Sequence, residues 1–203
     1  TMPGVYRYTV DKLYLIMNQA QKEHIPMVAL FPYTPKNKKD LIGTESLNEE
    51  NLVCRAIRKI KKKYKNIGVM TDVALDPYTS SGHDGLIINN IIDNDKTIDA
   101  LVKQSLLQAE MGSDIIAPSD MMDGRIGVIR KALEKNNFKD TMILSYAVKY
   151  ASNFYGPFRD AVGSKKNLKG NKKTYQMSFN NSTEALREVA LDIKEGADMV
   201  MVK

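Results

Sequence analysis

Two lysines in this sequence each stand directly after a short apolar run. Lys149 follows the run 142–148, and Lys203 follows the run 199–202. A lysine at a strand end more often keeps its ammonium group in water than reacts, because its stem is long enough to reach solvent. If both runs are parallel strands, their carboxyl ends meet at one mouth, where burial and the neighbouring charge lower the pKa of both amines. Neutral amines form Schiff bases, so the pair predicts carbonyl chemistry.

Further polar side chains follow two other apolar runs. Asp72 and Asp76 lie in Thr-Asp-Val-Ala-Leu-Asp-Pro-Tyr, and Ser119 and Asp120 lie in Ala-Pro-Ser-Asp-Met-Met-Asp-Gly-Arg. Residues just past the strands of a parallel barrel gather around the active site. Asp72 and Asp120 therefore suit proton handling or the binding of an amine. Capping of a loop or a helix explains each of them equally well.

The elements that position these residues follow from hydrophobic periodicity. Thr9 and Asn48 are predicted N-caps of the first two helices, and Gly196 closes the last helix. A hairpin is expected to turn at Asn89-Asn90, because asparagine tolerates positive φ. Strands are predicted at 27–31, 67–71, 115–117, 142–148 and 199–202, and the helices have apolar stripes within 10–20, 53–64, 98–109, 126–133 and 186–193.

The predicted strands are apolar throughout, which is typical of parallel strands that helices cover on both faces. Neither G-x-G-x-x-G nor a P-loop occurs, which argues against a doubly wound nucleotide-binding sheet. We therefore predict an α/β fold of the (β/α)8 TIM-barrel class. A closed barrel has eight strands, and the five readable here correspond to the second to sixth. Residues 1–203 are expected to form a single partial catalytic domain that lacks the N-terminal arm, the first strand and the last two strands.

Composition excludes several classes of function. No apolar run approaches the roughly 20 residues of a membrane span, so no membrane partner is expected. The lone Cys54 excludes an internal disulfide and a multi-cysteine zinc site, and suits a reducing compartment. The net charge of +6 comes largely from clusters at 55–65 and 165–173. The first cluster lies on a helix opposite an apolar stripe. Its one aromatic residue, Tyr64, belongs to that stripe and is not interleaved with the basic face, so a nucleic-acid partner is not expected.

Four longer blocks resemble one enzyme family. They are Thr71-Asp-Val-Ala-Leu-Asp-Pro-Tyr-Thr with Gly82-His-Asp-Gly, Ala117-Pro-Ser-Asp-Met-Met-Asp-Gly-Arg, Ser145-Tyr-Ala-Val-Lys-Tyr-Ala-Ser with Phe154-Tyr-Gly-Pro-Phe-Arg, and Gly196-Ala-Asp-Met-Val-Met-Val-Lys. Together they resemble the porphobilinogen synthase (5-aminolevulinate dehydratase) family along essentially the whole chain. The resemblance implies a lyase that condenses two 5-aminolevulinate molecules asymmetrically to porphobilinogen, with loss of water through lysine Schiff bases, in tetrapyrrole and heme biosynthesis.

The resemblance also assigns roles to individual residues. It gives Lys203 to the first substrate molecule and Lys149 to the second, and a catalytic role to Asp72. It implies a mobile lid over 165–173, for which Gly163 and Gly170 are candidate hinges and a solvated loop is the alternative. Substrate binding is expected from Ser119, Asp120, Tyr155, Arg159, Lys172 and Gln176. Arg159 suits a bidentate carboxylate contact, whereas Lys172 replaces a common arginine, keeping the charge and losing the fork.

The resemblance further bears on metal. The zinc-dependent branch has three cysteines at the positions of Ala74, Asp76 and Asp84, so no catalytic Zn²⁺ is expected, because carboxylates favour a hard ion such as Mg²⁺. Members without the cysteines often bind an allosteric Mg²⁺ through a glutamate that Glu188 matches. Asp76 and Asp84 are less specific metal candidates. Spacing alone makes Glu188 a surface helix residue. Ser81 departs from the His or Asp common at its position.

The family implies a homo-oligomer, usually an octamer. The aspartate-bearing loop indicates the plastid or bacterial branch, and hence a plastid-type organelle such as the apicoplast or the chloroplast stroma, with the cytoplasm as the alternative. Two other functions stay open: a class I aldolase that uses one lysine, and a catalytically silent fragment that keeps only assembly contacts. Assayed alone, this chain is expected to form little or no porphobilinogen. Open strand edges would favour its aggregation.

Overall fold

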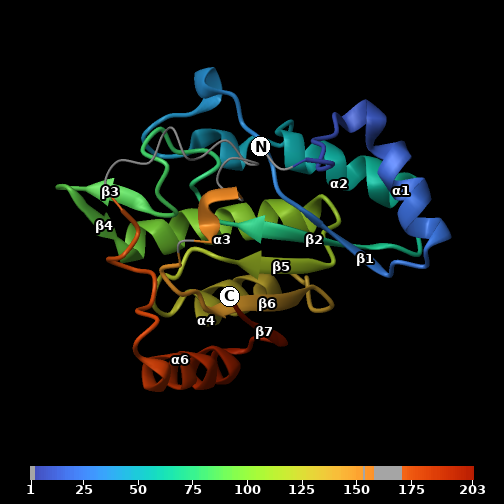
Figure 1. Cartoon of the computed structure of the whole chain (residues 1–203). Helices are drawn as coiled ribbons and strands as arrows, with labels where there is room; N and C mark the ends of the chain where they lie inside the picture. Colours follow the sequence, from blue (N-terminus) through green and yellow to red (C-terminus); the bar gives the residue numbers. More distant parts are fainter. Residues whose placement is uncertain (1–2, 153, 158–170) are drawn as a thin grey trace.

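The computed structural model describes residues 3–152, 154–157 and 171–203, and its centre is a parallel sheet (Figure 1). The strands run in the order β1-β2-β5-β6-β7, with every neighbouring pair parallel. This arrangement confirms the predicted partial (β/α)8 barrel with five strands in the described chain. The strands are β1 (Met27–Leu30), β2 (Gly68–Val73), β5 (Ile115–Pro118), β6 (Met142–Val148) and β7 (Met199–Val202).

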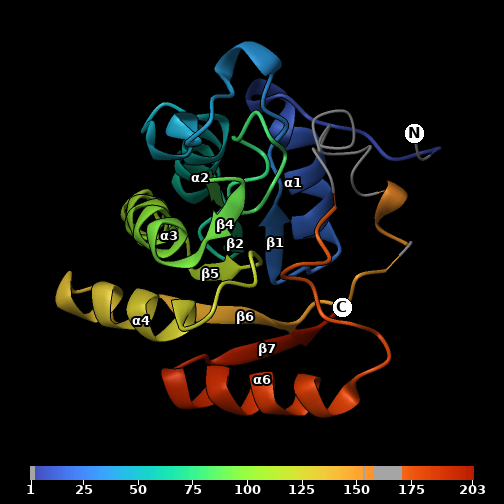
Figure 2. The same ribbon diagram turned by 90° about the vertical axis from the view of Figure 1, so that its left-hand side faces the viewer.

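Helices cover the sheet, and α6 runs alongside β7 (Figure 2). They are α1 (Leu13–Lys22), α2 (Leu52–Lys63), α3 (Asn94–Glu110), α4 (Arg125–Lys135) and α6 (Ser182–Glu195), with 3-10 turns at Val10–Lys12, Lys36–Lys38 and Thr44–Leu47. The largest apolar core joins α3 and α4 to the sheet through residues such as Leu101, Ile116 and Ile126. A second core joins α1 and α2 to β1 and β2 around Met17 and Ile57. Among the described helices, none is both long enough and apolar enough to cross a membrane.

Of the two predicted N-caps, Thr9 has the predicted position and Asn48 is wrong. Thr9 is the N-cap of the 3-10 turn that leads into α1, although its side chain makes no capping hydrogen bond. Helix α2 is capped by Asn51, whose Oδ1 accepts a hydrogen bond from the backbone N–H of Cys54 at 2.9 Å. Asn48 instead accepts from the backbone N–H of Glu50, two residues on, which closes a local turn before the helix begins.

The predicted hairpin is present as β3 (Leu86–Ile88) and β4 (Ile91–Asp93). Asn89 and Asn90 have φ of 50° and 65°, as a two-residue turn of this hand requires. The last helix differs from expectation, because Leu186 is 73% and Ile193 56% exposed on its predicted inner stripe. Helix α6 packs on β6, β7 and α4, and these two side chains lie outside that contact.

A repeated Gly-X-Asp connection precedes two of the strands, β5 and β7. Gly112 and Gly196 end their helices with φ of 105° and 107°, a conformation that favours glycine. Asp114 then accepts from the backbone N–H of Val69 at 2.8 Å, and Asp198 accepts from that of Ile143 at 2.7 Å. Each aspartate therefore ties the beginning of its own strand to the neighbouring strand and helps to set the sheet register.

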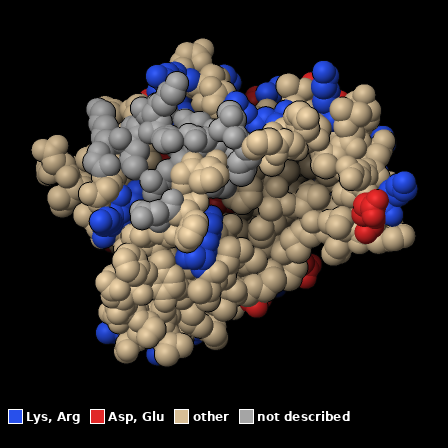
Figure 3. Space-filling view, in the orientation of Figure 1, with Lys and Arg blue, Asp and Glu red and all other residues tan. Residues whose placement is uncertain are grey.

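Basic side chains are scattered over the face seen in Figure 3 rather than gathered in one patch. Within the α2 cluster, Lys61 pairs with Asp114 at 2.8 Å and Arg58 pairs with Glu50 at 2.6 Å. Both pairs are partly exposed, as expected for a solvated helix face.

Candidate active site

A polar cavity lies at the carboxyl ends of the strands and gathers most of the predicted site residues. Nine of them line it: Asp72, Asp76, Asp84, Ser119, Lys149, Tyr155, Lys172, Gln176 and Lys203. They come from segments far apart in the chain, and the strand ends bring them together, as the barrel prediction requires. Arg159 and the lid segment 165–170, with Gly163 and Gly170, lie outside the described residues.

The two lysines are register neighbours on adjacent strands. The backbone N–H of Lys203 donates to the carbonyl of Val148 at 2.7 Å, and the N–H of Tyr150 donates to the carbonyl of Lys203 at 2.9 Å. In a parallel ladder this pattern places Lys203 directly beside Lys149. Adjacent strands lie about 4.8 Å apart, so both side chains reach the same cavity.

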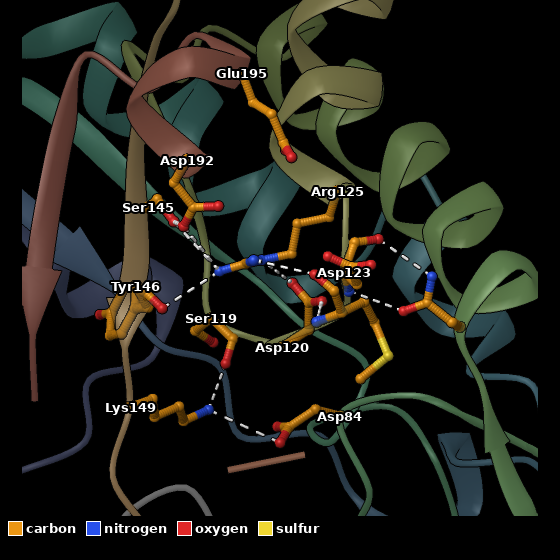
Figure 4. Close-up of polar contacts among 12 residues, drawn as sticks. Asp84, Ser119, Asp120, Asp123, Arg125, Ser145, Tyr146, Lys149, Asp192 and Glu195 are labelled. Carbon is orange, nitrogen blue, oxygen red and sulfur yellow. Dashed lines mark hydrogen bonds and ion pairs between the residues drawn. The ribbon is translucent and has the colours of Figure 1, made fainter. Parts of the chain in front are cut away.

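Lys149 is buried and held by two oxygen groups (Figure 4). Its Nζ donates a hydrogen bond to the backbone carbonyl of Ser119 and lies 3.8 Å from Oδ2 of Asp84. These contacts come from the ends of β5 and of the loop after β2. They hold the amine in the cavity, away from bulk solvent.

Lys203 has an aromatic surrounding. Its Nζ lies 4.9 Å from the ring centre of Tyr155 and 5.6 Å from that of Tyr146. Burial, followed by the positive charge of Lys149, lowers the pKa of Lys203 below its ordinary value. A lowered pKa enlarges the neutral fraction of this amine, which is the nucleophilic form.

Three aspartates give the cavity its negative charge. Burial, with the charge of Asp76 next, raises the pKa of Asp72 to about 7, and Oδ1 of Asp72 has no hydrogen-bond partner among the described residues. Burial also raises the pKa of Asp76. For Asp84 burial acts in the same direction, but the charges of Lys149 and Lys172 outweigh it and lower its pKa to about 2. Asp72 is thus poised to exchange a proton near neutrality, whereas Asp84 stays ionised.

Lys172 closes the aspartate side of the cavity. Its Nζ lies 3.0 Å from Oδ1 of Asp84 and 3.2 Å from Oδ2 of Asp76. Although burial acts against the charged amine, the two carboxylates raise the pKa of Lys172. The residue predicted to bind a substrate carboxylate is therefore already paired with protein carboxylates in this structure.

Asp120, which is predicted to bind substrate, does not line the cavity. Its Oδ1 accepts from the backbone N–H of Met122 at 2.8 Å, and its Oδ2 lies 3.4 Å from Nε of Arg125. Successive side chains leaving a strand point to opposite sides, so Ser119 lines the cavity while Asp120 points into the helix layer. Burial raises the pKa of Asp120 to about 6 despite the charge of Arg125.

Arg125 is a buried centre of polar contacts that the sequence reading missed (Figure 4). It donates to the carbonyls of Met122 and Tyr146 at 3.0 and 3.3 Å and to Oγ of Ser145 at 3.2 Å. It also lies 3.7 Å from Oδ2 of Asp192 on α6. The available signal was its position on α4, four and eight residues before the buried Ile129 and Leu133, where a charged side chain must find partners.

Other cavity residues were also missed. Tyr146, Phe31, Pro32 and Pro77 line the cavity. Phe31 and Pro32 directly follow β1, so the rule that drew attention to residues after the other strands would have found them. Tyr146 lies inside β6, where only the alternation of side chains along the strand gives a signal.

The metal candidates lie in two different places. Glu188 lines a separate hollow with Asp123 and Arg125, and burial, with the charge of Asp192 next, raises its pKa. Asp76 and Asp84 are occupied by Lys172. No group of three or more His, Cys, Asp or Glu side chains is arranged for a metal ion within the described part of the chain.

Comparison with known proteins agrees with this geometry. The family model for "Delta-aminolevulinic acid dehydratase" matches residues 1–203. The chain is 59% identical to the delta-aminolevulinic acid dehydratase of Bradyrhizobium diazoefficiens and 47% identical to a chloroplastic one of rice, covering all of this chain and 58% and 48% of those proteins. It also superimposes with a TM-score of 0.97 on the Toxoplasma gondii enzyme solved with porphobilinogen, at 45% identity, covering all of this chain and 58% of that one.

The chain thus spans between 48% and 58% of the length of these relatives. Each of these matches covers the entire length of this chain. The chain belongs to the delta-aminolevulinic acid dehydratase family.

Proposed function

We propose that the protein containing this chain is a porphobilinogen synthase, which condenses two molecules of 5-aminolevulinate to porphobilinogen with loss of water. The observation that supports this best is the register of Lys149 and Lys203, which places two amines on adjacent strands around one cavity. A class I aldolase needs one such lysine. The related Toxoplasma gondii enzyme was solved with porphobilinogen as its reaction product.

The proposed reaction begins with two imines. The neutral amine of each lysine adds to the ketone of a substrate molecule, and the carbinolamine then loses water as it accepts a proton on its hydroxyl group. Lys203, with its lowered pKa, takes the first substrate molecule, and Lys149 takes the second. Asp72, with a pKa of about 7, gives and recovers the proton, because a group that titrates near the working pH serves both directions.

Substrate binding in this proposal uses the charges already paired in the cavity. 5-Aminolevulinate carries an ammonium group and a carboxylate. Its ammonium group can replace that of Lys172 on Asp76 and Asp84, which releases Lys172 toward the substrate carboxylate. Arg159 is proposed as the second carboxylate partner, and Ser119, Tyr155 and Gln176 as the polar wall of the cavity.

We further propose Mg²⁺ as an allosteric ion at Glu188, held largely through water. The donor set fits, because Asp123 and Asp192 add negative charge beside a partly buried carboxylate whose pKa is raised, and a cation relieves that repulsion. Catalytic Zn²⁺ is not part of the proposal, because Ala74 offers no ligand and Lys172 neutralises Asp76 and Asp84. Titration calorimetry with MgCl₂, comparing the native chain with Glu188→Gln, tests the site without an activity measurement.

The assembly and compartment are proposals as well. We propose a homo-octamer, which native mass spectrometry tests directly. A plastid-type organelle is proposed because a chloroplastic rice relative is 47% identical. Two bacterial relatives, at 59% and 51% identity, are more similar to this chain, so the cytoplasm is the alternative. Microscopy of the tagged full-length protein separates the two.

Reductive trapping tests the proposed chemistry. The protein is incubated with 5-aminolevulinate and sodium borohydride, which turns an imine into a stable secondary amine, and peptide mass spectrometry then locates the adduct. Label on both Lys149 and Lys203 is expected, and Lys149→Met and Lys203→Met should each lose one site. Label on one lysine only, and only with a sugar phosphate, indicates the aldolase. No label with either compound indicates the silent fragment.

A further inference from the structure

Helix α3 turns two buried glutamines toward the strand that carries Asp72. Gln104 and Gln108 are 0% and 2% exposed and lie four residues apart, so both point to the same side of the helix. The rest of that side is largely apolar, with Ile98 and Leu101 in the core. Burying a primary amide in such a place costs folding free energy unless the amide forms hydrogen bonds. The hydrogen-bond partners of these two side chains therefore indicate what the side chains do.

Those partners are backbone and side-chain groups on either side of Asp72. Nε2 of Gln108 donates to the carbonyl of Asp72 itself at 3.2 Å, and Oε1 of Gln108 accepts from Oγ1 of Thr71 at 2.7 Å. Nε2 of Gln104 donates to the carbonyl of Ala74 at 3.4 Å. The helix therefore holds the main chain at Asp72 and Ala74 and the side chain of Thr71, on both sides of the candidate proton carrier.

The contacts fall where the sheet stops supporting this strand. β1 pairs with β2 only as far as Thr71, and the register with β5 ends at Val73 opposite Pro118, where the backbone N–H of Ser119 donates to the carbonyl of Val73 at 3.1 Å. Side chains alternate along β2, so Thr71 faces α3 while Asp72 faces the cavity. An amide that fixes the peptide groups around Asp72 therefore also fixes the direction of its carboxyl group.

We propose that Gln108, supported by Gln104, is a positioning residue that sets the orientation of the Asp72 carboxyl group toward Lys149 and Lys203. The inference rests on the proposed function for its kinetic consequence, but the placement of Asp72 can be measured without any reaction. If Gln108 only filled space under β2, replacing it would affect folding. It would change neither the titration of Asp72 nor the contribution of Asp72 to the reaction rate.

The first test is a double-mutant cycle. Gln108→Leu removes both hydrogen bonds at similar volume, and the rate of borohydride-trapped imine formation is measured with and without Asp72→Asn. A loss of about tenfold or more is expected in the native background, because small misplacements of a catalytic group are costly. Little further loss is expected beside Asp72→Asn. Equal losses in both backgrounds would overturn the proposal.

The second test reads the position of Asp72 directly by ¹³C NMR titration of its carboxyl group in the ligand-free protein. Asp76, Asp84 and Lys149 also act on this group, so all variants keep them. The titration is expected near pH 7 in the native protein and closer to about 3.9 in Gln108→Leu, where the loosened carboxyl group reaches water. An unchanged titration midpoint in Gln108→Leu would also overturn the proposal.

Two further variants serve as a control for Gln108→Leu and as a substitute for it. Ser105→Ala is the matched control, because Ser105 is buried on the same helix and its Oγ has no hydrogen-bond partner within the described ranges. It should change neither the rate nor the titration. If Gln108→Leu does not fold, Thr71→Val removes the hydrogen bond to Gln108, together with the one to Oγ of Ser113, at constant shape and should shift the titration in the same direction. Failure of native protein to form any imine contradicts the proposed function, while the NMR result still decides the placement of Asp72.

Discussion

Lys172→Met should destabilise the protein in a strongly pH-dependent way. The change leaves Asp76 and Asp84 buried beside one another without the ammonium group 3.0–3.2 Å away. Removing one partner of a buried ion pair typically costs about 3–5 kcal/mol of unfolding free energy. The shift of Asp84 from 3.8 to about 2 gives an independent figure, because at 1.36 kcal/mol per pKa unit it corresponds to about 2 kcal/mol. Lys149 supplies part of that shift, so Lys172 accounts for only a fraction of it.

The direction in which stability changes with pH follows from the lowered pKa of Asp84. A carboxyl group with a lowered folded-state pKa stabilises the fold above its unfolded pKa, and this contribution is lost as pH falls through the folded value. Native protein should therefore lose the Asp84 contribution between about pH 4 and pH 2. In Lys172→Met both aspartates take up protons at higher pH, so the stability difference between the two proteins should be largest above about pH 7 and narrow in acid.

Urea denaturation followed by circular dichroism at about pH 8, 5 and 3 measures this difference. Lys173→Met is the matched control, since Lys173 is the exposed neighbour. It should change the unfolding free energy by less than about 0.5 kcal/mol at each pH. A difference between Lys172→Met and native protein that does not vary with pH, or that equals the control, would refute the reasoning.

Three other outcomes are expected. Asp72→Asn should make the rate of imine trapping independent of pH near pH 7, because the group that titrates there is removed. If the rate still changes with pH near 7 in this variant, another group is responsible for the change. Arg125→Met should lower the unfolding free energy by about 3 kcal/mol or more, because two buried aspartates lose their cationic partner. Lys131→Met, at an exposed position of the same helix, should not lower it, and thermal melts compare the two variants. Glu188→Gln should abolish calorimetric Mg²⁺ binding, and binding that persists moves the ion elsewhere.

The sequence predicted the strands and the place of the two lysines at strand ends because both depend on local patterns. Apolar runs such as 142–148 are buried on both faces, and a polar residue that follows such a run reaches the rim. This rule did not predict that Asp120 lies outside the cavity lining, because it locates the end of a strand but not the side to which each side chain points. The rule did not find Arg125, because the partners of Arg125 come from three other segments of the chain. Long-range polar pairing is set by tertiary packing, which periodicity does not encode.

The alignment of the two lysines depends on a feature that periodicity also does not encode. Ser145 pairs with Val200 and Val148 pairs with Val202, so three steps along β6 match two along β7. Without this bulge Lys203 would stand beside Val148. A shift of one residue in register turns a side chain to the opposite face of a sheet, so Lys149 and Lys203 would no longer share a cavity. The irregularity at Tyr146 and Ala147 therefore brings both amines to one side, and the same bulge places the ring of Tyr146 5.6 Å from Nζ of Lys203.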